Sequence, residues 1–180
     1  MKLLIASDIH GSAVYAEQLL YRLKAEGADR LVLLGDVLYH GPRNDLPDGY
    51  APKAVIELLN PLAQKILCVR GNCDTEVDQM VLSFPLLADY AAILDGNRVL
   101  YLTHGHIYNE QHLPPVQPGD AVLYGHTHIP VMHTVNGITF INPGSVSIPK
   151  AGSTRGYVIY ESGHFVRKDL EGHWEAEFAY

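Results

Sequence analysis

The stretch Lys2-Leu3-Leu4-Ile5-Ala6-Ser7-Asp8-Ile9-His10-Gly11 has a pattern that recurs along the chain. Its first half is a short apolar run, and its second half carries an aspartate, a histidine and a glycine. A strand buried on both faces of a parallel sheet has such an apolar run, and polar residues follow it at the carboxyl end. We therefore predict a first β-strand over Lys2–Ala6 that brings Asp8 and His10 to one edge of a sheet.

A helix and a second strand follow this first strand. Apolar residues at positions 16, 19, 20 and 23 have helical spacing, and Gly27 predicts the end of the helix. Arg30–Leu34 is predicted as a strand that ends in Gly35-Asp36. The three elements form a strand–helix–strand unit, whose crossover we expect to be right-handed.

The pattern then recurs once more in the first half. Residues 37–51 are predicted as a long loop, and loops of this length in a compact domain are often functional. A helix is predicted from Pro52 to about Leu59, before Pro61. The strand Lys65–Val69 ends in Gly71-Asn72-Cys73-Asp74, and a short helix over 75–82 is predicted with Asp74 as its cap.

The second half is predicted to be rich in β-strands. A hairpin over 91–102 leads to His104-Gly105-His106, and a strand over Ala121–Tyr124 leads to Gly125-His126-Thr127-His128. A second hairpin turns at Asn136-Gly137, and strands are expected near 156–160, 163–168 and 174–178. We predict one α/β domain over residues 1–180, in which two mixed sheets pack face to face with helices outside. Parallel strands should dominate the first half and antiparallel strands the second.

Composition excludes several classes of function. Hydrophobic residues make up 47% and charged residues 18% of the chain, which is the composition of an ordinary soluble globular protein. The net charge is −7 and no basic block occurs, so non-specific nucleic-acid binding and a membrane-surface helix are disfavoured. No apolar run reaches the length of a membrane span, and the apolar start is too short for a signal peptide.

The two cysteines, Cys68 and Cys73, do not have the spacing of a disulfide framework. A reducing cytoplasm is therefore the expected compartment. The β-rich stretch over 157–178 offers an edge that another subunit could pair with, so a homo-oligomer, a dimer or a tetramer, is a further expectation.

Seven polar side chains follow the predicted strands. They comprise two carboxylates, four histidines and one asparagine, namely Asp8, His10, Asp36, Asn72, His104, His126 and His128. Ligands of open α/β sheets bind at the carboxyl ends of the strands, so these residues can converge on one edge. Nitrogen and oxygen ligands without cysteine suit Mn²⁺, Fe²⁺ or Zn²⁺. Seven ligands exceed the needs of one tetrahedral ion and suit two ions that share a carboxylate.

The order of these blocks resembles the calcineurin-like metallophosphoesterase superfamily. Asp8-x-His10, Gly35-Asp36, Gly71-Asn72-Cys73-Asp74, His104-Gly105 and Gly125-His126-Thr127-His128 follow one another as that family's motifs do. Asn142-Pro143-Gly144-Ser145 and the insert after Asp36 further resemble its YfcE-type branch of bacterial phosphodiesterases. The resemblance covers nearly the whole chain and implies a four-layer α-β-β-α sandwich.

The resemblance also implies a role for each residue. One divalent ion takes Asp8, His10 and His128, the other takes Asn72, His104 and His126, and Asp36 bridges them. Mn²⁺ is the favoured ion, with Zn²⁺, Fe²⁺, Ni²⁺ or Mg²⁺ as alternatives. A metal-bridging hydroxide would then attack phosphorus in line, and the ions would stabilise the charge of the transition state. Asn72, Cys73 and His104 are the residues expected to take part in catalysis.

Cys73 stands where much of the superfamily has a histidine that assists the leaving oxygen. A thiol is a weak hydrogen-bond donor, and general acid help is worth roughly 10²–10⁴-fold. The cysteine therefore favours small phosphodiesters with good leaving groups over phosphomonoesters, and the YfcE-type branch shares it. The alternative is a non-catalytic scaffold, similar to the retromer subunit of the same superfamily.

Several residues keep more than one interpretation. Asp8 alone would suit a helix cap, and His106 is either a neighbour of the metal ligands or a loop residue. Residues Tyr39, His40 and Arg43 either contact substrate or belong to a solvated loop. The turn residues Asn142 and Ser145 can orient ligands through hydrogen bonds. The remaining histidines, at positions 112, 133, 164 and 173, are predicted to be structural or exposed.

Overall fold

The apolar residues of the first strand divide the core in two. In the computed structural model, which describes residues 1–179, β1 (Lys2–Ala6) packs Leu4 and Ala6 in one cluster with helical residues. Leu3 and Ile5 pack in a second cluster, between the two sheets. Successive side chains of a strand point to opposite faces, so a run that is apolar throughout must be covered on both sides.

Two sheets result. One has the order β11-β10-β9-β1-β2-β3, and the other has the order β4-β5-β6-β8-β7. In the first sheet β1, β2 and β3 are parallel and the rest antiparallel, with bounds β2 Arg30–Leu33, β3 Ile66–Cys68, β9 Gly156–Glu161, β10 His164–Asp169 and β11 Trp174–Ala179. The second sheet comprises β4 Tyr90–Asp95, β5 Arg98–Thr103, β6 Ala121–Leu123, β7 Val131–Val135 and β8 Ile138–Asn142.

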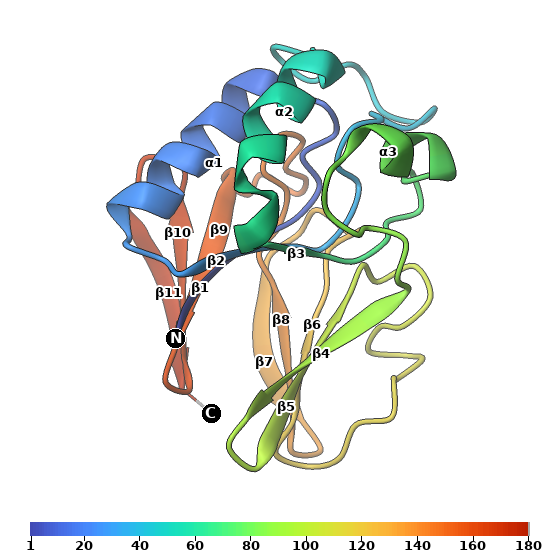
Figure 1. The fold of residues 1–180 in the computed structure, drawn as a ribbon. Coiled ribbons are helices and arrows are strands. Elements are labelled where there is room, and N and C mark those ends of the chain that lie inside the picture. The colour runs from blue at the N-terminus through green and yellow to red at the C-terminus, as the bar shows by residue number, and fades with distance from the viewer. Residues whose placement is uncertain (180) are drawn as a thin grey trace.

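Two helices cover the outer face of the six-stranded sheet (Figure 1). Helix α1 (Ala13–Ala25) buries Ala16, Leu19 and Leu23, which are three of the residues whose spacing predicted it. Helix α2 (Pro52–Leu59) starts at its proline as expected. The chain then continues through the short 3₁₀ helix η1 (Asn60–Lys65), because a proline is tolerated in the first turn of a helix.

The predicted fold class, an α/β sandwich of two mixed sheets flanked by helices, is confirmed. The outer face of the second sheet is covered in part by the irregular segment after β5, whose Val116 packs against the cluster of Val122, Tyr124, Ile138 and Phe140. The second half is mostly antiparallel, but β5–β6 and β6–β8 are parallel pairs. Among residues 1–179, no helix has both the length and the apolar character that crossing a bilayer requires.

One local prediction was wrong. The short helix α3 (Glu76–Val81) is capped by Thr75, which forms a reciprocal capping box with Asp78. Asp74 is buried and accepts hydrogen bonds from the backbone N–H groups of Asp36, Val37 and Gly71, at 2.8, 2.9 and 2.7 Å. A carboxylate that satisfies three buried donors joins two loops, and it is therefore not available to cap a helix.

Candidate metal centre

All seven predicted ligands follow strands that belong to parallel pairs. Asp8 and His10 follow β1, Asp36 follows β2 and Asn72 follows β3 in one sheet. In the other sheet His104 follows β5, and His126 and His128 follow β6. Since parallel strands end on the same side of their sheet, the two faces of the sandwich bring these loops together.

The backbone is strained at most of these residues. Asp8, His10, Asp36, His126 and His128 have positive φ angles of 59°, 49°, 55°, 64° and 59°. A left-handed conformation is uncommon for residues other than glycine and costs on the order of 1–3 kcal/mol each. The strain turns the chain sharply at each strand end, and such outliers gather at functional sites.

Two glycines permit the loops to approach one another. A Cβ on Gly71 would lie 2.1 Å from Asp36 Oδ1, and a Cβ on Gly125 would lie 1.9 Å from Ser7 Oγ and 2.7 Å from Asp8 Oδ2. Both distances are shorter than any non-bonded contact allows. The glycines of the Gly-Asn and Gly-His motifs are therefore required by packing against the two carboxylates.

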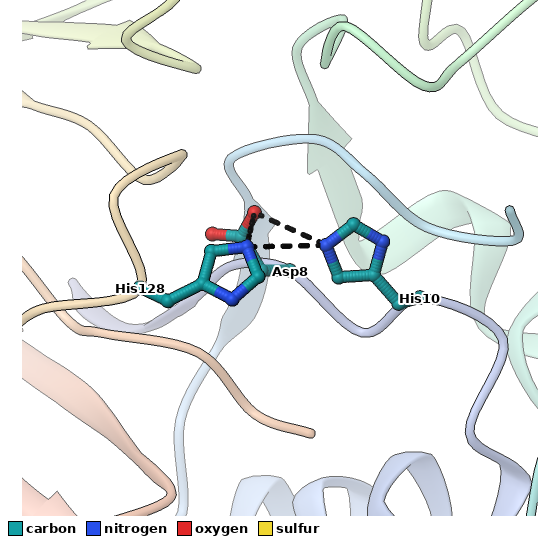
Figure 2. Close-up of side chains that lie close together, drawn as sticks. All are labelled: Asp8, His10 and His128. Carbon is teal, nitrogen blue, oxygen red and sulfur yellow. Dashed lines mark hydrogen bonds and ion pairs between the residues drawn. The ribbon is translucent and has the colours of Figure 1, made fainter. Parts of the chain in front are cut away.

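Asp8, His10 and His128 form a tight group (Figure 2). The Nε2 atoms of His10 and His128 lie 3.2 Å apart, and Asp8 Oδ1 lies 3.6 Å from the first and 3.2 Å from the second. All three residues are at most 2% exposed. Three ligand atoms of this kind, which face one another in the interior, surround a position suited to a small cation.

The rings of these two histidines are fixed from behind. His10 Nδ1 lies 2.8 Å from the carbonyl oxygen of Tyr39, and His128 Nδ1 lies 2.6 Å from that of Ile148. A carbonyl oxygen only accepts, so each Nδ1 carries the hydrogen and donates it. In the neutral ring Nε2 then keeps its lone pair, and the lone pair faces the cluster as a metal ligand requires.

The carboxylate of Asp8 is ionised in this setting. Burial opposes ionisation, but the neighbouring imidazoles of His10 and His128 hold the pKa of Asp8 well below its ordinary value. Its Oδ1 is nevertheless buried without a hydrogen-bond partner among the described residues. A buried, charged oxygen left without a donor is costly, and a cation between the three side chains would satisfy it.

Asp36 lies between this group and a second one. Its Oδ2 is 3.7 Å from His10 Nε2 and 3.4 Å from His104 Nε2, and its Oδ1 accepts the N–H of Cys73 at 2.8 Å. Burial opposes ionisation here too, but the hydrogen bond from His104 lowers the pKa of Asp36. This position suits a carboxylate that would contact a cation in each of the two groups.

The second group is looser. His104 Nε2 lies 3.1 Å from Asn72 Oδ1, and His104 Nδ1 lies 2.6 Å from the carbonyl oxygen of Leu34. The His126 ring lies 5.1 Å from the His104 ring, centroid to centroid, and is less deeply buried. Although burial opposes it, the interaction with Asp36 raises the pKa of His104 to about 9, whereas burial and the charge of His104 lower the pKa of His126.

Cys73 lies at the junction of the two groups. Its Sγ accepts a hydrogen bond from Asn72 Nδ2 at 3.2 Å, and a Cβ on Gly41 would lie 3.1 Å from the sulfur. Burial and the charge of Asp36 raise the pKa of the thiol to about 12. At neutral pH the side chain is therefore a neutral thiol, which is a weak hydrogen-bond donor.

The turn after β8 supports the loops of both groups. Asn142 Nδ2 donates to Gly125 O at 2.8 Å and to Thr127 Oγ1 at 3.1 Å, so it holds the His126–His128 loop. Ser145 Oγ donates to the carbonyl oxygen of Asp8 at 2.8 Å. Sequence reasoning named these two residues but missed Ser147, whose Oγ donates to the same oxygen at 3.0 Å. The proximity of Ser147 to the Asn-Pro-Gly-Ser turn was the only available signal.

The residues with more than one interpretation take different roles in the structure. Tyr39 contributes a backbone carbonyl to His10, and the His106 ring lies 5.4 Å from that of His104. His40 packs between Tyr39 and Tyr50, so its ring is part of the loop's own packing. The four histidines at 112, 133, 164 and 173 lie outside the groups described above and form other contacts.

An open cleft of about 430 Å³ gives access to the centre. Both groups and the 37–51 loop contribute to its walls. Its lining comprises His10, Asp36, Gly41, Pro42, Arg43, Asn44, Asn72, Cys73, His126, Thr127, His128 and Lys150. The volume lies in the range of small-molecule sites.

Comparisons with known proteins agree with this geometry. A family model described as the calcineurin-like phosphoesterase superfamily domain matches residues 1–163. The chain is 52% identical over 162 residues to phosphodiesterase YfcE of Escherichia coli strain K12, which covers 90% of this chain and 88% of that protein. The solved structure of YfcE, a phosphoesterase from E. coli, has a TM-score of 0.97 at 47% identity and covers 99% of both chains.

A more distant structure shares the fold alone. Vps29 of Entamoeba histolytica in complex with Zn²⁺ is 20% identical, with a TM-score of 0.65, and covers 99% of each chain. At this identity the likeness carries no information about activity.

Proposed function

We propose that this chain, which belongs to the calcineurin-like phosphoesterase superfamily, is a metal-dependent phosphodiesterase with two ions that hydrolyses small phosphodiesters. The observation that carries the proposal is the unsatisfied Oδ1 of Asp8 between the Nε2 atoms of His10 and His128. The similarity to phosphodiesterase YfcE supports the choice of diesters as substrates.

Each proposed ligand set corresponds to one of the two groups. Asp8, His10 and His128 would hold one ion. Asn72, His104 and His126 would hold the other, and Asp36 would contact both. Mn²⁺ is the ion we propose first, because the imidazole and carboxylate ligands suit it. When bound, such a pair of ions generates a nucleophile from water at neutral pH and neutralises the phosphoryl oxygens.

The protein's own contribution is positioning. The carbonyl oxygens of Tyr39, Ile148 and Leu34 orient His10, His128 and His104, and the hydroxyls of Ser145 and Ser147 hold the backbone of Asp8. The Asn72 amide nitrogen donates a hydrogen bond to Cys73 Sγ, and this bond keeps the Asn72 side-chain oxygen directed toward His104. A site so preorganised needs little reorganisation during the reaction.

Protonation of the leaving group is where this site is weak. The Cys73 thiol keeps its proton at neutral pH because its pKa is about 12, so it is a poor acid for a departing alkoxide. General acid catalysis contributes roughly 10²–10⁴-fold where it operates. We therefore propose diesters with stable leaving groups, such as aryl oxides, as the better substrates.

The test is hydrolysis of an aryl phosphodiester by the purified protein with Mn²⁺, with and without EDTA. We expect metal-dependent turnover that falls by about 10³-fold or more in His128→Ala, since a lost ion costs several kcal/mol of charge stabilisation. His164→Ala, which alters an exposed histidine on β10, is the matched control. Absence of turnover in every metal, or full activity of His128→Ala, would contradict the proposal.

The alternative, a non-catalytic scaffold, would be favoured by metal binding without turnover. We do not favour it, because both proposed ligand sets are complete here. We further propose the cytoplasm as the compartment, supported by the two free cysteines, and a homo-oligomer, which sedimentation can test.

A further inference from the structure

The cleft carries two basic side chains on the segments that orient the proposed ligands. Tyr39, whose carbonyl accepts from His10, lies four residues before Arg43. Ile148, whose carbonyl accepts from His128, lies two residues before Lys150, and the Lys150 N–H donates to the His128 carbonyl at 3.2 Å. Arg43 and Lys150 both line the cleft. The backbone of Lys150 is therefore held beside His128, and Arg43 lies on the segment whose Tyr39 orients His10.

Among the described residues, neither of these side chains has a polar partner. Over residues 1–179 the guanidinium of Arg43 and the ammonium of Lys150 have no hydrogen bond or ion pair, and both residues are exposed. Some other basic groups are engaged, since Arg22 donates to Leu170 O and Lys168 to Glu26. In a chain of net charge −7, two unpaired cations on one cleft form a local field that attracts anions.

The two basic side chains are more exposed than the proposed metal ligands. The proposed ligands Asp8, His10 and His128 are buried, whereas Arg43 and Lys150, which also line the cleft, are exposed. A phosphoryl group bound to ions among the buried ligands is reached through the cleft. The space of about 430 Å³ exceeds what one phosphoryl group needs, so an ester arm also fits within it.

We propose that Arg43 and Lys150 bind a second anionic group, carried on a short ester arm of the phosphodiester. The inference rests on the proposed function and narrows its substrate class to diesters that bear a further phosphate or carboxylate. A guanidinium pairs with either group through two parallel hydrogen bonds, and the lysine adds a flexible point charge. A diester with uncharged arms would leave both cations solvated and would gain nothing from them.

The test compares two diesters with one leaving group. Ethyl p-nitrophenyl phosphate has an uncharged arm, and 2-(phosphonooxy)ethyl p-nitrophenyl phosphate carries a second phosphate on the same arm. For the Mn²⁺-loaded protein we expect kcat/KM to favour the second substrate by about tenfold, the order expected for two partly exposed ion pairs. The preference should shrink as salt is raised from 0.05 M to 0.5 M.

Variants assign the preference to the two residues. In Arg43→Gln/Lys150→Gln the ratio of the two kcat/KM values should fall to about one, and each single variant should remove about threefold. Lys24→Gln/Lys65→Gln removes the same net charge from exposed positions outside the cleft and should keep the ratio. A wild-type ratio near one, or a ratio that the cleft variant retains, would overturn the proposal.

A binding measurement tests the anion subsite independently of hydrolysis. Calorimetry compares diethyl phosphate with ethyl 2-(phosphonooxy)ethyl phosphate, which lack the reactive aryl group. Tighter binding of the second probe to the wild type, lost in the cleft variant, supports the subsite even if no diester is hydrolysed. Equal binding of the two probes refutes it even if the phosphodiesterase activity is found. Replacing the second phosphate by a carboxylate then shows which anion the pair prefers.

Discussion

The Asp8–His10–His128 group and the Asn72–His104–His126 group have similar ligand types but differ in how firmly they are held. In the first group the ligand atoms lie 3.2–3.6 Å apart, and both imidazoles are fixed by carbonyl oxygens. In the second only His104 is fixed in this way, while Asn72 is exposed and His126 is less deeply buried than His128. We infer that the first group is preorganised and the second closes around its ion.

The difference follows from the loops. His128 Nδ1 and the Lys150 N–H connect the His128 residue to the 148–150 segment, and Asp8 is held through its carbonyl by Ser145 and Ser147. All of these contacts come from the chain after β8. In the second group the Leu34 carbonyl oxygen fixes His104 in a comparable way, but among residues 1–179 the His126 ring makes no such hydrogen bond. A preorganised ligand set pays less entropy when it binds its ion.

Asp36→Asn should have the largest effect, because the Asp36 carboxylate lies beside His10 of one group and His104 of the other. Without this negative charge the positive charge of both ions would be less well compensated. We therefore expect kcat/KM on an aryl diester to fall by about 10³–10⁴-fold. Metal analysis of the dialysed variant should show both ions weakened. Asp89→Asn, an exposed carboxylate before β4, is the control. Retention of two tightly bound ions would show that the groups are independent of Asp36.

His128→Ala and His126→Ala test the comparison directly. His128→Ala should remove the firmly held ion and leave about one ion per chain. His126→Ala should weaken the binding of the other ion without abolishing it, since the looser group can adjust around its remaining ligands. Equilibrium dialysis with Mn²⁺ measures both constants. If the two variants lose the same ion, the division of ligands between the groups is wrong.

The dependence of metal binding on pH sharpens the comparison further. Without metal, His104 has a pKa of about 9, so it is protonated at pH 7, whereas the lowered pKa of His126 leaves that ring neutral. A metal ligand must be deprotonated, so an ion that binds His104 displaces one proton. Its affinity should rise about tenfold per pH unit from 7 to 9 and level off above 9.

Calorimetry in buffers of different ionisation enthalpy counts the displaced protons. Wild type should release one proton more than His104→Ala at pH 7.5, while His126→Ala should release the same number as wild type. A metal affinity that does not change between pH 7 and 9 would contradict the raised pKa of His104.

The positions of the proposed ligands were predictable from the sequence, but the groups that hold them in place were not. An apolar run followed by Asp, Asn or His marks the carboxyl end of a buried strand, so Asp8, Asp36 and His104 were placed correctly at strand ends, although these strands belong to two sheets rather than one. Their hydrogen-bond partners are mostly backbone carbonyls, such as Tyr39 O and Leu34 O, which every residue possesses. No residue type identifies such a partner in a sequence.

Two further features lay beyond sequence reasoning for other reasons. Asp74 stands just before a helix, where a cap is the common role, but the folded loops bring three N–H groups to its carboxylate. The positive φ angles occur at Asp8, His10 and His128, which are residue types that adopt this conformation more often than most but still uncommonly. Long-range packing determines both features, so local propensity does not reveal them.

The smallest effect is expected at Cys73, which lies at the junction of the two groups and is not among the proposed ligands of either ion. Cys73→Ser keeps the shape and replaces one weak hydrogen bond, worth up to about 1.5 kcal/mol, so activity on an aryl diester should fall by less than about tenfold. A larger loss for an alkyl diester than for an aryl diester would show that the thiol assists the leaving oxygen.

Alkylation of Cys73 measures the same point without turnover. The thiol has a pKa of about 12, so the rate with iodoacetamide should rise about tenfold per pH unit from 7 to 10 without a plateau. The chain with Cys68→Ala leaves Cys73 as the only cysteine. A plateau below pH 9 would mean that a thiolate exists near neutral pH. Because Cys73 lies beside His10 and Asp36, such a thiolate would be a further metal ligand and not a neutral part of the cleft wall.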